Sequence, residues 1–230
     1  GLERRRKRNA DQLRRLKAVN RRRLTGMAAV NYESVLFDLQ STADADAKFV
    51  YGGHGPGAPY VLSQITGSWQ QVPDFLATQH RIETREDCEA YVSRLEAFGR
   101  VMDQEIERVR RDAGLGVVPP DFAVRGAISG MKVLRAPAPK STLVTALADR
   151  AKAKGIAGDW TARATAAYEA KVIPALDRQI ALMESLRPKA VHDAGCWRLP
   201  DGEAYYAQSL AALTTTKLTP AEVHQMGLDV

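Results

Sequence analysis

Apolar residues recur every three or four positions along residues 84–109, and this spacing limits the possible folds more than any other feature of the chain. The recurring residues are Cys88, Tyr91, Val92, Leu95, Met102, Ile106 and Val109. Residues at this spacing share one face of an α-helix, which then packs on a hydrophobic core. Thr84 and Asp87 have the spacing of an N-terminal capping box, and Gly114 and Gly116 end the pattern. We therefore expect one long helix between these signals.

Similar helical spacing covers most of the remaining chain. Further helices are expected at residues 3–24, 25–39, 120–134, 141–154, 159–183 and 204–216, and from 219 onward. Thr25 and Asp159 supply N-caps, and Pro174 should kink the helix that contains it. No segment alternates apolar and polar residues as a half-buried strand does. The sequence therefore predicts an all-α protein, a multi-helix array of about eight helices.

Residues 49–83 interrupt this pattern. Glycines and prolines at their start give way to aromatic and apolar residues, so we expect a long ordered loop with short helical turns. The GGHGPG segment resembles a phosphate-binding loop, but Ala58 and Pro59 follow where such a loop needs Lys and then Ser or Thr. We interpret GGHGPG as a turn.

Both ends of the sequence suggest a fragment. Thr219, Pro220 and Glu222 form a helix-start signal, and the sequence stops within the apolar stripe that follows. Gly1 stands where an initiator methionine is usual. We therefore expect residues 1–230 to be the N-terminal helical portion of a single larger domain, truncated at both ends.

Most of the positive charge lies near the N-terminus. The net charge is +6, yet residues 1–24 hold eleven Lys or Arg and two acids, a net +9, whereas the other 22 basic and 25 acidic residues sum to −3. Arginines surround Leu13, Leu16 and Leu24, as is typical of the solvated face of a helix. The alternative is contact with nucleic acid or an acidic surface. Because no nucleic-acid-reading motif accompanies the arginines, nucleic acid is the less favoured partner.

The composition is that of a globular protein, with 45% hydrophobic and 26% charged residues. No apolar run approaches the roughly 20 residues of a membrane span, and no signal-peptide pattern is present. Because we expect the chain to lack its natural N-terminus, an exported location (periplasm or cell envelope) and a cytoplasmic one both stay open. Cys88 and Cys196 fit either two free thiols or one long-range disulfide.

The chain contains no recognisable catalytic motif. Its four histidines, His54, His80, His192 and His224, are followed by Gly, Arg, Asp and Gln, so the H-E-x-x-H zinc motif is absent. We therefore expect no catalytic residue and no metal or cofactor in this chain. The GAISG segment at residues 126–130 lacks the preceding strand of a nucleophile elbow, so we interpret it as helix packing.

Tyr205 and Tyr206 are the candidate substrate-binding residues. Adjacent side chains on a helix point about 100° apart, so one tyrosine can pack in the core while the other presents its phenol elsewhere. A phenol combines apolar area with a hydrogen-bonding tip, which suits contact with a peptide. The competing interpretation is that both rings are structural.

Four segments carry a resemblance to a known family. They are LKAVNRRRLTGMAAVNYESVLFDLQ, PYVLSQITGSWQQVPDFLATQHRIETREDCEAYVSRLEAF, GVVPPDFAV and WRLPDGEAYYAQSLAALTTTKLTPAEVHQMGLD. In this order they resemble the bacterial family known as domain of unknown function 885 (DUF885) over nearly the whole chain. The last segment is the most specific.

The resemblance implies a fold and an activity. Members look like large, mostly helical, zincin-like zinc metallopeptidases, whose H-E-x-x-H helix lies beyond the region similar to this chain. The full-length protein is then expected to bind zinc and a peptide substrate and to need a missing C-terminal half. This chain would be its non-metal-binding N-terminal portion, inactive alone. The alternatives are a catalytically inactive peptide-binding relative and a helical interaction module that uses the basic N-terminal helix.

Overall fold

The computed structural model describes residues 2–53 and 56–229, so Gly1, His54, Gly55 and Val230 lie outside the described residues. The described part contains ten α-helices, six short 3₁₀ or π turns and no strand, which confirms the predicted all-α fold. Two more α-helices form than expected, because a short helix lies within residues 49–83 and a π turn divides the helix at 159–183. The chain divides into unit 1, residues 1–59 and 195–230, and unit 2, residues 60–194.

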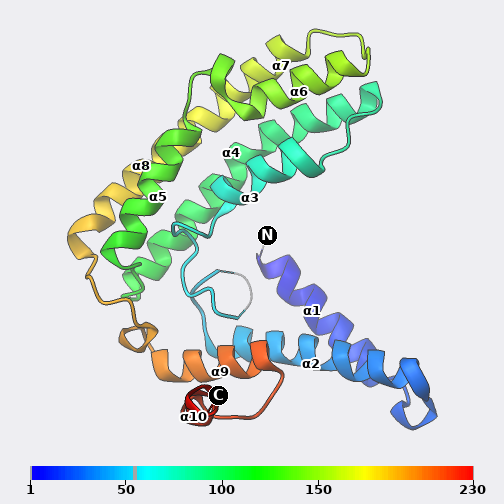
Figure 1. Cartoon of the computed structure of the whole chain (residues 1–230), viewed down its shortest axis with the longest axis vertical. Coiled ribbons are helices and arrows are strands. Elements are labelled where there is room, and N and C mark those ends of the chain that lie inside the picture. The colour runs from blue at the N-terminus through cyan, green and yellow to red at the C-terminus, as the bar shows by residue number, and fades with distance from the viewer. Residues whose placement is uncertain (1, 54–55, 230) are drawn as a thin grey trace. The chain divides into compact units, whose positions relative to one another are not determined.

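Unit 1 is built from helices that pack in pairs (Figure 1). Its elements are α1 (Leu2–Lys17), η1 (Arg21–Arg23), α2 (Gly26–Lys48), η6 (Cys196–Arg198), α9 (Gly202–Thr214) and α10 (Pro220–Leu228). Helix α2 packs against both α1 and α9, and α10 packs against α9. Thr219 and Glu222 form the predicted capping box at the start of α10, where each side chain accepts a hydrogen bond from the other residue's backbone N–H.

The basic N-terminal helix is shorter than the predicted span of residues 3–24. It ends at Lys17, and the Asn20 side chain then accepts a hydrogen bond from Arg22 N (3.1 Å) and caps η1. Asn side chains compete for backbone hydrogen bonds in this way and therefore favour turns over helix. Thr25 precedes α2 as expected, but its side chain makes no capping hydrogen bond. The last residues of the expected helix therefore form a 3₁₀ turn, η1.

Unit 2 is a helical bundle organised around α4 (Figure 1). Its elements are α3 (Ser68–Asp74), η2 (Phe75–Gln79), α4 (Arg85–Gly114), α5 (Asp121–Leu134), η3 (Ala138–Lys140), α6 (Thr142–Ala153), α7 (Trp160–Ala167), η4 (Tyr168–Val172), α8 (Ile173–Leu186) and η5 (Arg187–Lys189). Helix α4 contacts α3, α6, α7, η4 and α8, and is therefore the helix on which most of the others pack.

Helix α4 confirms the long helix predicted from the apolar stripe. Asp87 N donates to Thr84 Oγ1 (3.3 Å) and Thr84 N donates to the Asp87 carboxylate (3.0 Å), which completes the capping box. All the apolar residues of the stripe are buried. They join a continuous core that also contains Val124, Met131, Leu143, Leu147, Tyr168, Leu176 and Met183. Burial of the stripe thus places α4 at the centre of unit 2.

The interruption expected at Pro174 takes the form of a π turn. Turn η4 lies directly before α8, and Ile173 N donates to Tyr168 O, five residues earlier. Proline lacks the N–H that continues an α-helical ladder, so the regular hydrogen bonding is interrupted near Pro174. The backbone of η4 also approaches α4 closely, since a Cβ added at Gly99 would lie only 2.4 Å from Lys171 O. Only glycine allows this approach.

The GAISG segment takes part in helix packing, as predicted. A Cβ at Gly130 would lie 2.5 Å from the Trp69 ring, and a Cβ at Gly126 would lie 2.7 Å from Gln64 Cβ. Side chains larger than hydrogen at these positions would force α5 away from α3 and the segment before it.

Both cysteines are free thiols, Cys88 buried in unit 2 and Cys196 partly buried in unit 1. Burial raises the pKa of each thiol, so neither is a reactive thiolate near neutral pH. Within the described residues, we find no helix with both the length and the apolar character needed to cross a membrane.

Candidate functional site

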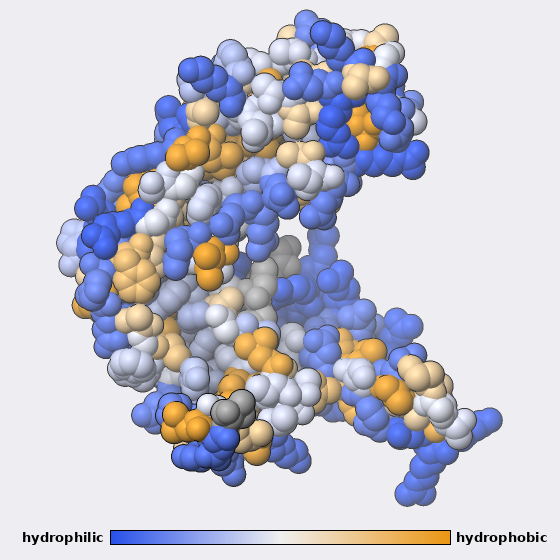
Figure 2. Space-filling model, in the orientation of Figure 1, coloured by the Kyte–Doolittle hydropathy of each residue, from blue (hydrophilic) through white to orange (hydrophobic). Residues whose placement is uncertain are grey.

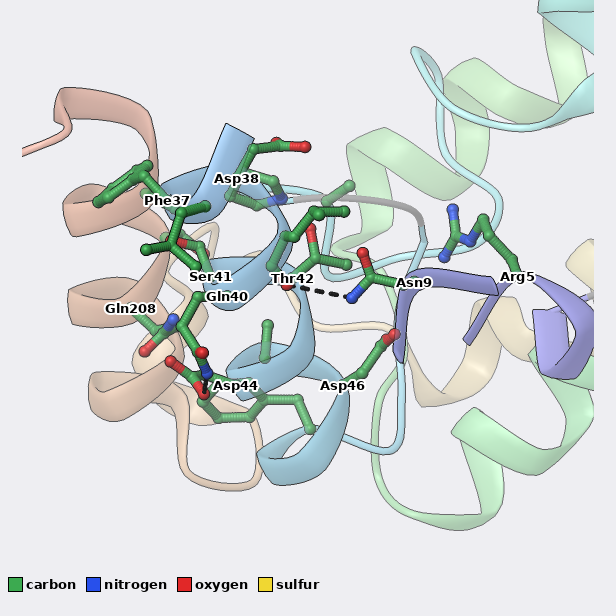
Figure 3. Close-up of a pocket in the computed structure, with 18 of the residues that line it drawn as sticks. Arg5, Asn9, Phe37, Asp38, Gln40, Ser41, Thr42, Asp44, Asp46 and Gln208 are labelled. Carbon is green, nitrogen blue, oxygen red and sulfur yellow. Dashed lines mark hydrogen bonds between the residues drawn. The ribbon is translucent and has the colours of Figure 1, made fainter. Parts of the chain in front are cut away.

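Unit 1 contains a cavity of about 1130 Å³ between α1, α2, the segment that follows α2, and α9 (Figure 3). Side-chain amides, hydroxyls, carboxylates, guanidinium groups and aromatic rings all contribute to its wall. Pockets for small molecules usually measure about 300–1,000 Å³. The volume therefore suits a segment of a peptide or another extended ligand.

Polar contacts hold the part of the wall that α1 and α2 form. Asn9 Nδ2 donates to Leu39 O (3.1 Å), and Lys17 Nζ donates to Gln40 Oε1 (2.6 Å). Gln40 Nε2 in turn donates to Asp44 Oδ1 (2.7 Å), and Figure 3 shows these two side chains joined on α2. Residues four apart on a helix are neighbours, which is why α2 aligns them. The wall therefore presents oriented polar groups.

Charges of both signs face the cavity. Arg5 and Arg8 come from α1, and Glu33, Asp38, Asp44 and Asp46 come from α2. Burial lowers the pKa of Arg5, while nearby Asp46 opposes this effect. Since carboxylates outnumber guanidinium groups, the wall favours a ligand that carries positive charge.

Three aromatic rings form the end of the cavity near α9. The Tyr205 ring centroid lies 5.1 Å from that of Phe49, edge to face, and 5.7 Å from that of Tyr51, stacked. Tyr51 Oη donates to Pro200 O (2.7 Å), which anchors the segment after α2 to the start of α9. All three rings line the cavity. They provide apolar area next to the polar wall.

The structure separates the two tyrosines that the sequence singled out. Tyr205 is only 8% exposed and combines packing in the aromatic cluster with a place in the cavity wall. Tyr206, the next residue on α9, is 51% exposed and does not line the cavity. The predicted divergence of adjacent side chains on a helix is therefore present, and Tyr205 is the one that faces the cavity.

The GGHGPG segment contributes to the wall through its described residues. Gly53 N donates to Ala58 O (2.7 Å), and Gly57 N donates to Ser209 Oγ on α9 (3.1 Å). Gly52 has φ of +93°, and a Cβ there would lie 3.0 Å from Ala58 O. These contacts tie both ends of the segment to unit 1. His54 and Gly55 lie outside the described residues, so the turn through them stays a prediction.

Several lining residues had no signal in the sequence. Asn9, Gln40, Asp44, Gln208 and Ser209 are common polar residues that lie far apart along the chain. Only the packing of α1, α2 and α9 brings them to one wall. A β-branched residue with positive φ, Thr215 at +56°, also lines the cavity. Such strain is uncommon and often marks functional surfaces, but only coordinates reveal it.

The histidines do not form a metal site in the described part of the chain, where no cluster of three His, Cys, Asp or Glu side chains could hold a metal ion. His80 is buried, with Nδ1 2.5 Å from Arg94 Nη1 and Nε2 2.9 Å from Asp87 O. Because the guanidinium can only donate, Nδ1 accepts and Nε2 carries the proton. His80 is therefore a packed structural residue.

Unit 2 contains a partly buried carboxylate, Glu105, on α4. It accepts hydrogen bonds from Ser68 N (2.8 Å), Ser68 Oγ (2.6 Å) and Gln179 Nε2 (2.9 Å). Burial raises the pKa of Glu105, and these hydrogen bonds only partly offset that effect. The carboxylate caps the N-terminus of α3 and joins it to α4 and α8, so its role here is structural.

Comparison with known proteins supplies the context for this geometry. The chain resembles the crystal structure of a putative lipoprotein from Colwellia psychrerythraea, with 21% sequence identity and a TM-score of 0.87. The match covers 97% of this chain and 40% of the other, so this chain spans less than half the length of that relative. No curated protein matches the sequence. The bacterial family of unknown function DUF885 matches residues 1–230, and the chain therefore belongs to that family.

Proposed function

We propose that this chain forms the substrate-binding helical portion of a zinc-dependent peptidase. The observation that carries the proposal is the cavity of unit 1, whose wall includes Tyr205. The reaction class comes from the resemblance of the family to helical metallopeptidases. In this proposal the zinc and the catalytic groups belong to a C-terminal portion of a longer protein, and the 40% share of the solved relative that this chain matches supports that arrangement.

The lining residues have the chemistry that peptide binding needs. A peptide backbone offers one donor and one acceptor per residue, and side-chain amides and hydroxyls can pair with both. The half-buried side chain of Gln208 lines the cavity without a hydrogen-bond partner among the described residues. Asn9 uses Nδ2 for Leu39 O and keeps its Oδ1 as an acceptor. These groups would orient the peptide, and the carboxylates of α2 would favour basic side chains or an amino terminus.

Zinc, when bound, would polarise the scissile carbonyl and activate a water molecule. Since no three-residue cluster of metal ligands exists among the described residues, we assign to them only binding and orientation of the substrate.

An apolar surface of unit 1 suits contact with the C-terminal portion. Leu213 of α9 and Met226 and Leu228 of α10 are 66%, 57% and 66% exposed. Large apolar side chains gathered on neighbouring helices commonly mark an interface. We propose that the C-terminal portion of the longer protein covers them.

Replacement of Tyr205 by Phe in the full-length protein tests the cavity. The change keeps the ring in the aromatic cluster and removes only the hydroxyl, so kcat/KM for peptide hydrolysis should fall about tenfold, or roughly 1.4 kcal/mol. Tyr206→Phe is the matched control and should change kcat/KM less than about twofold, since that hydroxyl faces away from the cavity. If both variants keep the kcat/KM of the parent while Tyr205→Phe lowers stability, Tyr205 is structural and the cavity is not the substrate site.

Gln208→Ala separates substrate binding from catalysis. We expect weaker peptide binding and a higher KM, with an unchanged zinc content and free energy of unfolding, because the side chain lines the cavity and makes no hydrogen bond in the described part of the chain. Gln71→Ala, an exposed glutamine of α3, is the control. Peptide binding without hydrolysis or zinc would identify the inactive relative, and absence of peptide binding would refute the proposal.

A further inference from the structure

The turn that joins α1 and α2 concentrates positive charge. We define the hairpin tip as residues 14–30, a segment with six Lys or Arg and no acidic residue. Some of these cations have partners, since Arg14 and Arg15 pair with Asp11 and Arg21 pairs with Glu33 at 2.5 Å. Arg22 and Arg23 are exposed, and among the described residues no carboxylate pairs with either. The tip therefore attracts an anionic surface.

Large apolar side chains project from the same tip. Val19 is 44% exposed, Met27 69% and Val30 54%. Met27 and Val30 are three residues apart at the start of α2, so they lie on one face of the helix. Figure 2 shows hydrophobic residues among strongly hydrophilic ones over the outer part of α2. Neither charge nor packing within the fold explains why these side chains face outward.

The turn is held in one conformation. Asn20 caps η1 by accepting a hydrogen bond from Arg22 N (3.1 Å), and Leu24 N donates to Arg21 O (3.1 Å). Arg21 bridges to Glu33 on α2. Because the turn is anchored at both ends, its apolar side chains and cations are already exposed in one conformation. The turn therefore loses little conformational entropy when it binds a surface.

We propose that the hairpin tip docks onto a membrane surface that contains anionic lipids. Arg22, Arg23 and neighbouring cations pair with lipid phosphates, while Met27, Val30 and Val19 enter the boundary between headgroups and acyl chains. Nucleic acid fits less well, because the tip contains no aromatic residue for base stacking and its apolar side chains would gain nothing from a phosphate backbone. The proposal is independent of the peptidase function.

Vesicle sedimentation with the 230-residue chain tests the proposal. Vesicles of phosphatidylcholine with phosphatidylserine should bind the chain, and vesicles of phosphatidylcholine alone should not. The double variant Met27→Ser/Val30→Ser keeps every charge and should bind at least tenfold more weakly. Arg22→Gln/Arg23→Gln should also weaken binding at least tenfold and reduce its salt dependence. Val133→Ser, at a 76% exposed position of α5, is the matched control and should bind like the parent.

Three results would overturn the proposal. One is no binding to the anionic vesicles at low salt. Another is unchanged binding by either double variant, which would show that insertion or the tip cations are not needed. The third is tighter binding to a short DNA or RNA duplex than to the vesicles, independent of Met27 and Val30, which would assign the tip to nucleic acid. Circular dichroism of each variant should match the parent, because every substituted side chain is exposed.

Discussion

The two units are both helical, yet they differ in how their helices are buried. Helix α4 of unit 2 has 30 residues, ten of which are buried, whereas none of the 23 residues of α2 in unit 1 is buried. The continuous hydrophobic core lies entirely in unit 2, between Val61 and Leu186. Among the described residues of unit 1, the buried apolar side chains are few, namely Leu13, Phe49, Leu199 and Tyr205. Unit 2 therefore contains the hydrophobic core, and the helices of unit 1 are more exposed.

Helical periodicity and burial are therefore separate properties of a helix. Most of the stability of a helix in a protein comes from the face that it buries, not from its intrinsic propensity. Helix α2 leaves Met27, Val30, Val35 and Phe37 exposed, while its polar residues line a cavity. Function requires accessible groups, so the less buried unit is where we place both proposed binding surfaces.

The largest expected effect comes from matched methionine substitutions in the two units. Met102→Ala in α4 removes a side chain that is 0% exposed, and unfolding in urea should show a loss of about 3 kcal/mol, within the range of buried Met→Ala changes. Met27→Ala in α2 removes a side chain that is 69% exposed and should change the free energy of unfolding by no more than about 0.5 kcal/mol. Equal losses would show that the units are buried to the same degree.

A smaller effect is expected where α4 meets η4. Gly99→Ala places a methyl group 2.4 Å from Lys171 O, and the backbones must separate, so we expect a loss of about 2 kcal/mol. Gly114→Ala on the same helix meets nothing within 4 Å and should be neutral or stabilising by up to about 1 kcal/mol. Chemical denaturation of both variants measures the difference. If Gly99→Ala is as stable as Gly114→Ala, the close approach of α4 and η4 does not exist.

The smallest effect concerns the pH dependence of unit 2. The pKa of Glu105 is raised by burial in the folded state, so its contribution to stability is complete below the unfolded pKa and is lost as the pH rises through the folded pKa. Glu105→Gln is neutral at every pH. Relative to the parent, this variant should therefore be more stable at about pH 8 than at about pH 4, values on either side of an ordinary glutamate pKa.

The control for this experiment is Glu107→Gln, which removes an exposed carboxylate from the same helix. We compare the unfolding free energy of the Glu105 variant with that of the parent at both pH values. The change in this difference between the two pH values tests whether burial raises the pKa of Glu105. A difference that stays constant, or that moves in favour of the parent at high pH, would contradict the role of burial at Glu105.

Much of the fold could be predicted because its signals are local. The capping boxes at Thr84 and Thr219 lie within four residues of the helices they start, and both form. The stripe of α4 needs only a periodicity of 3.6 residues to be recognised. The end of α1 was missed because Asn20 competes with a helical signal that continues through Leu24. Local competition of this kind is decided by small differences in free energy.

Only part of the candidate site could be predicted from the sequence. The divergence of Tyr205 and Tyr206 follows from helix geometry, but which of them faces a cavity does not. That choice depends on Phe49 and Tyr51, about 150 residues away in sequence, whose rings surround Tyr205. The polar wall of Asn9, Gln40 and Gln208 likewise depends on three helices meeting.

Most helices of this protein follow from local patterns in its sequence, because hydrogen-bonded caps and apolar periodicity act over a few neighbouring residues. Three features follow only from tertiary packing: unit 2 holds the continuous core, the Lys171 backbone lies against Gly99, and α1, α2 and α9 enclose a cavity. Each of these features arises from contacts between residues distant along the chain. Such contacts form when whole helices pack, and no local pattern encodes them.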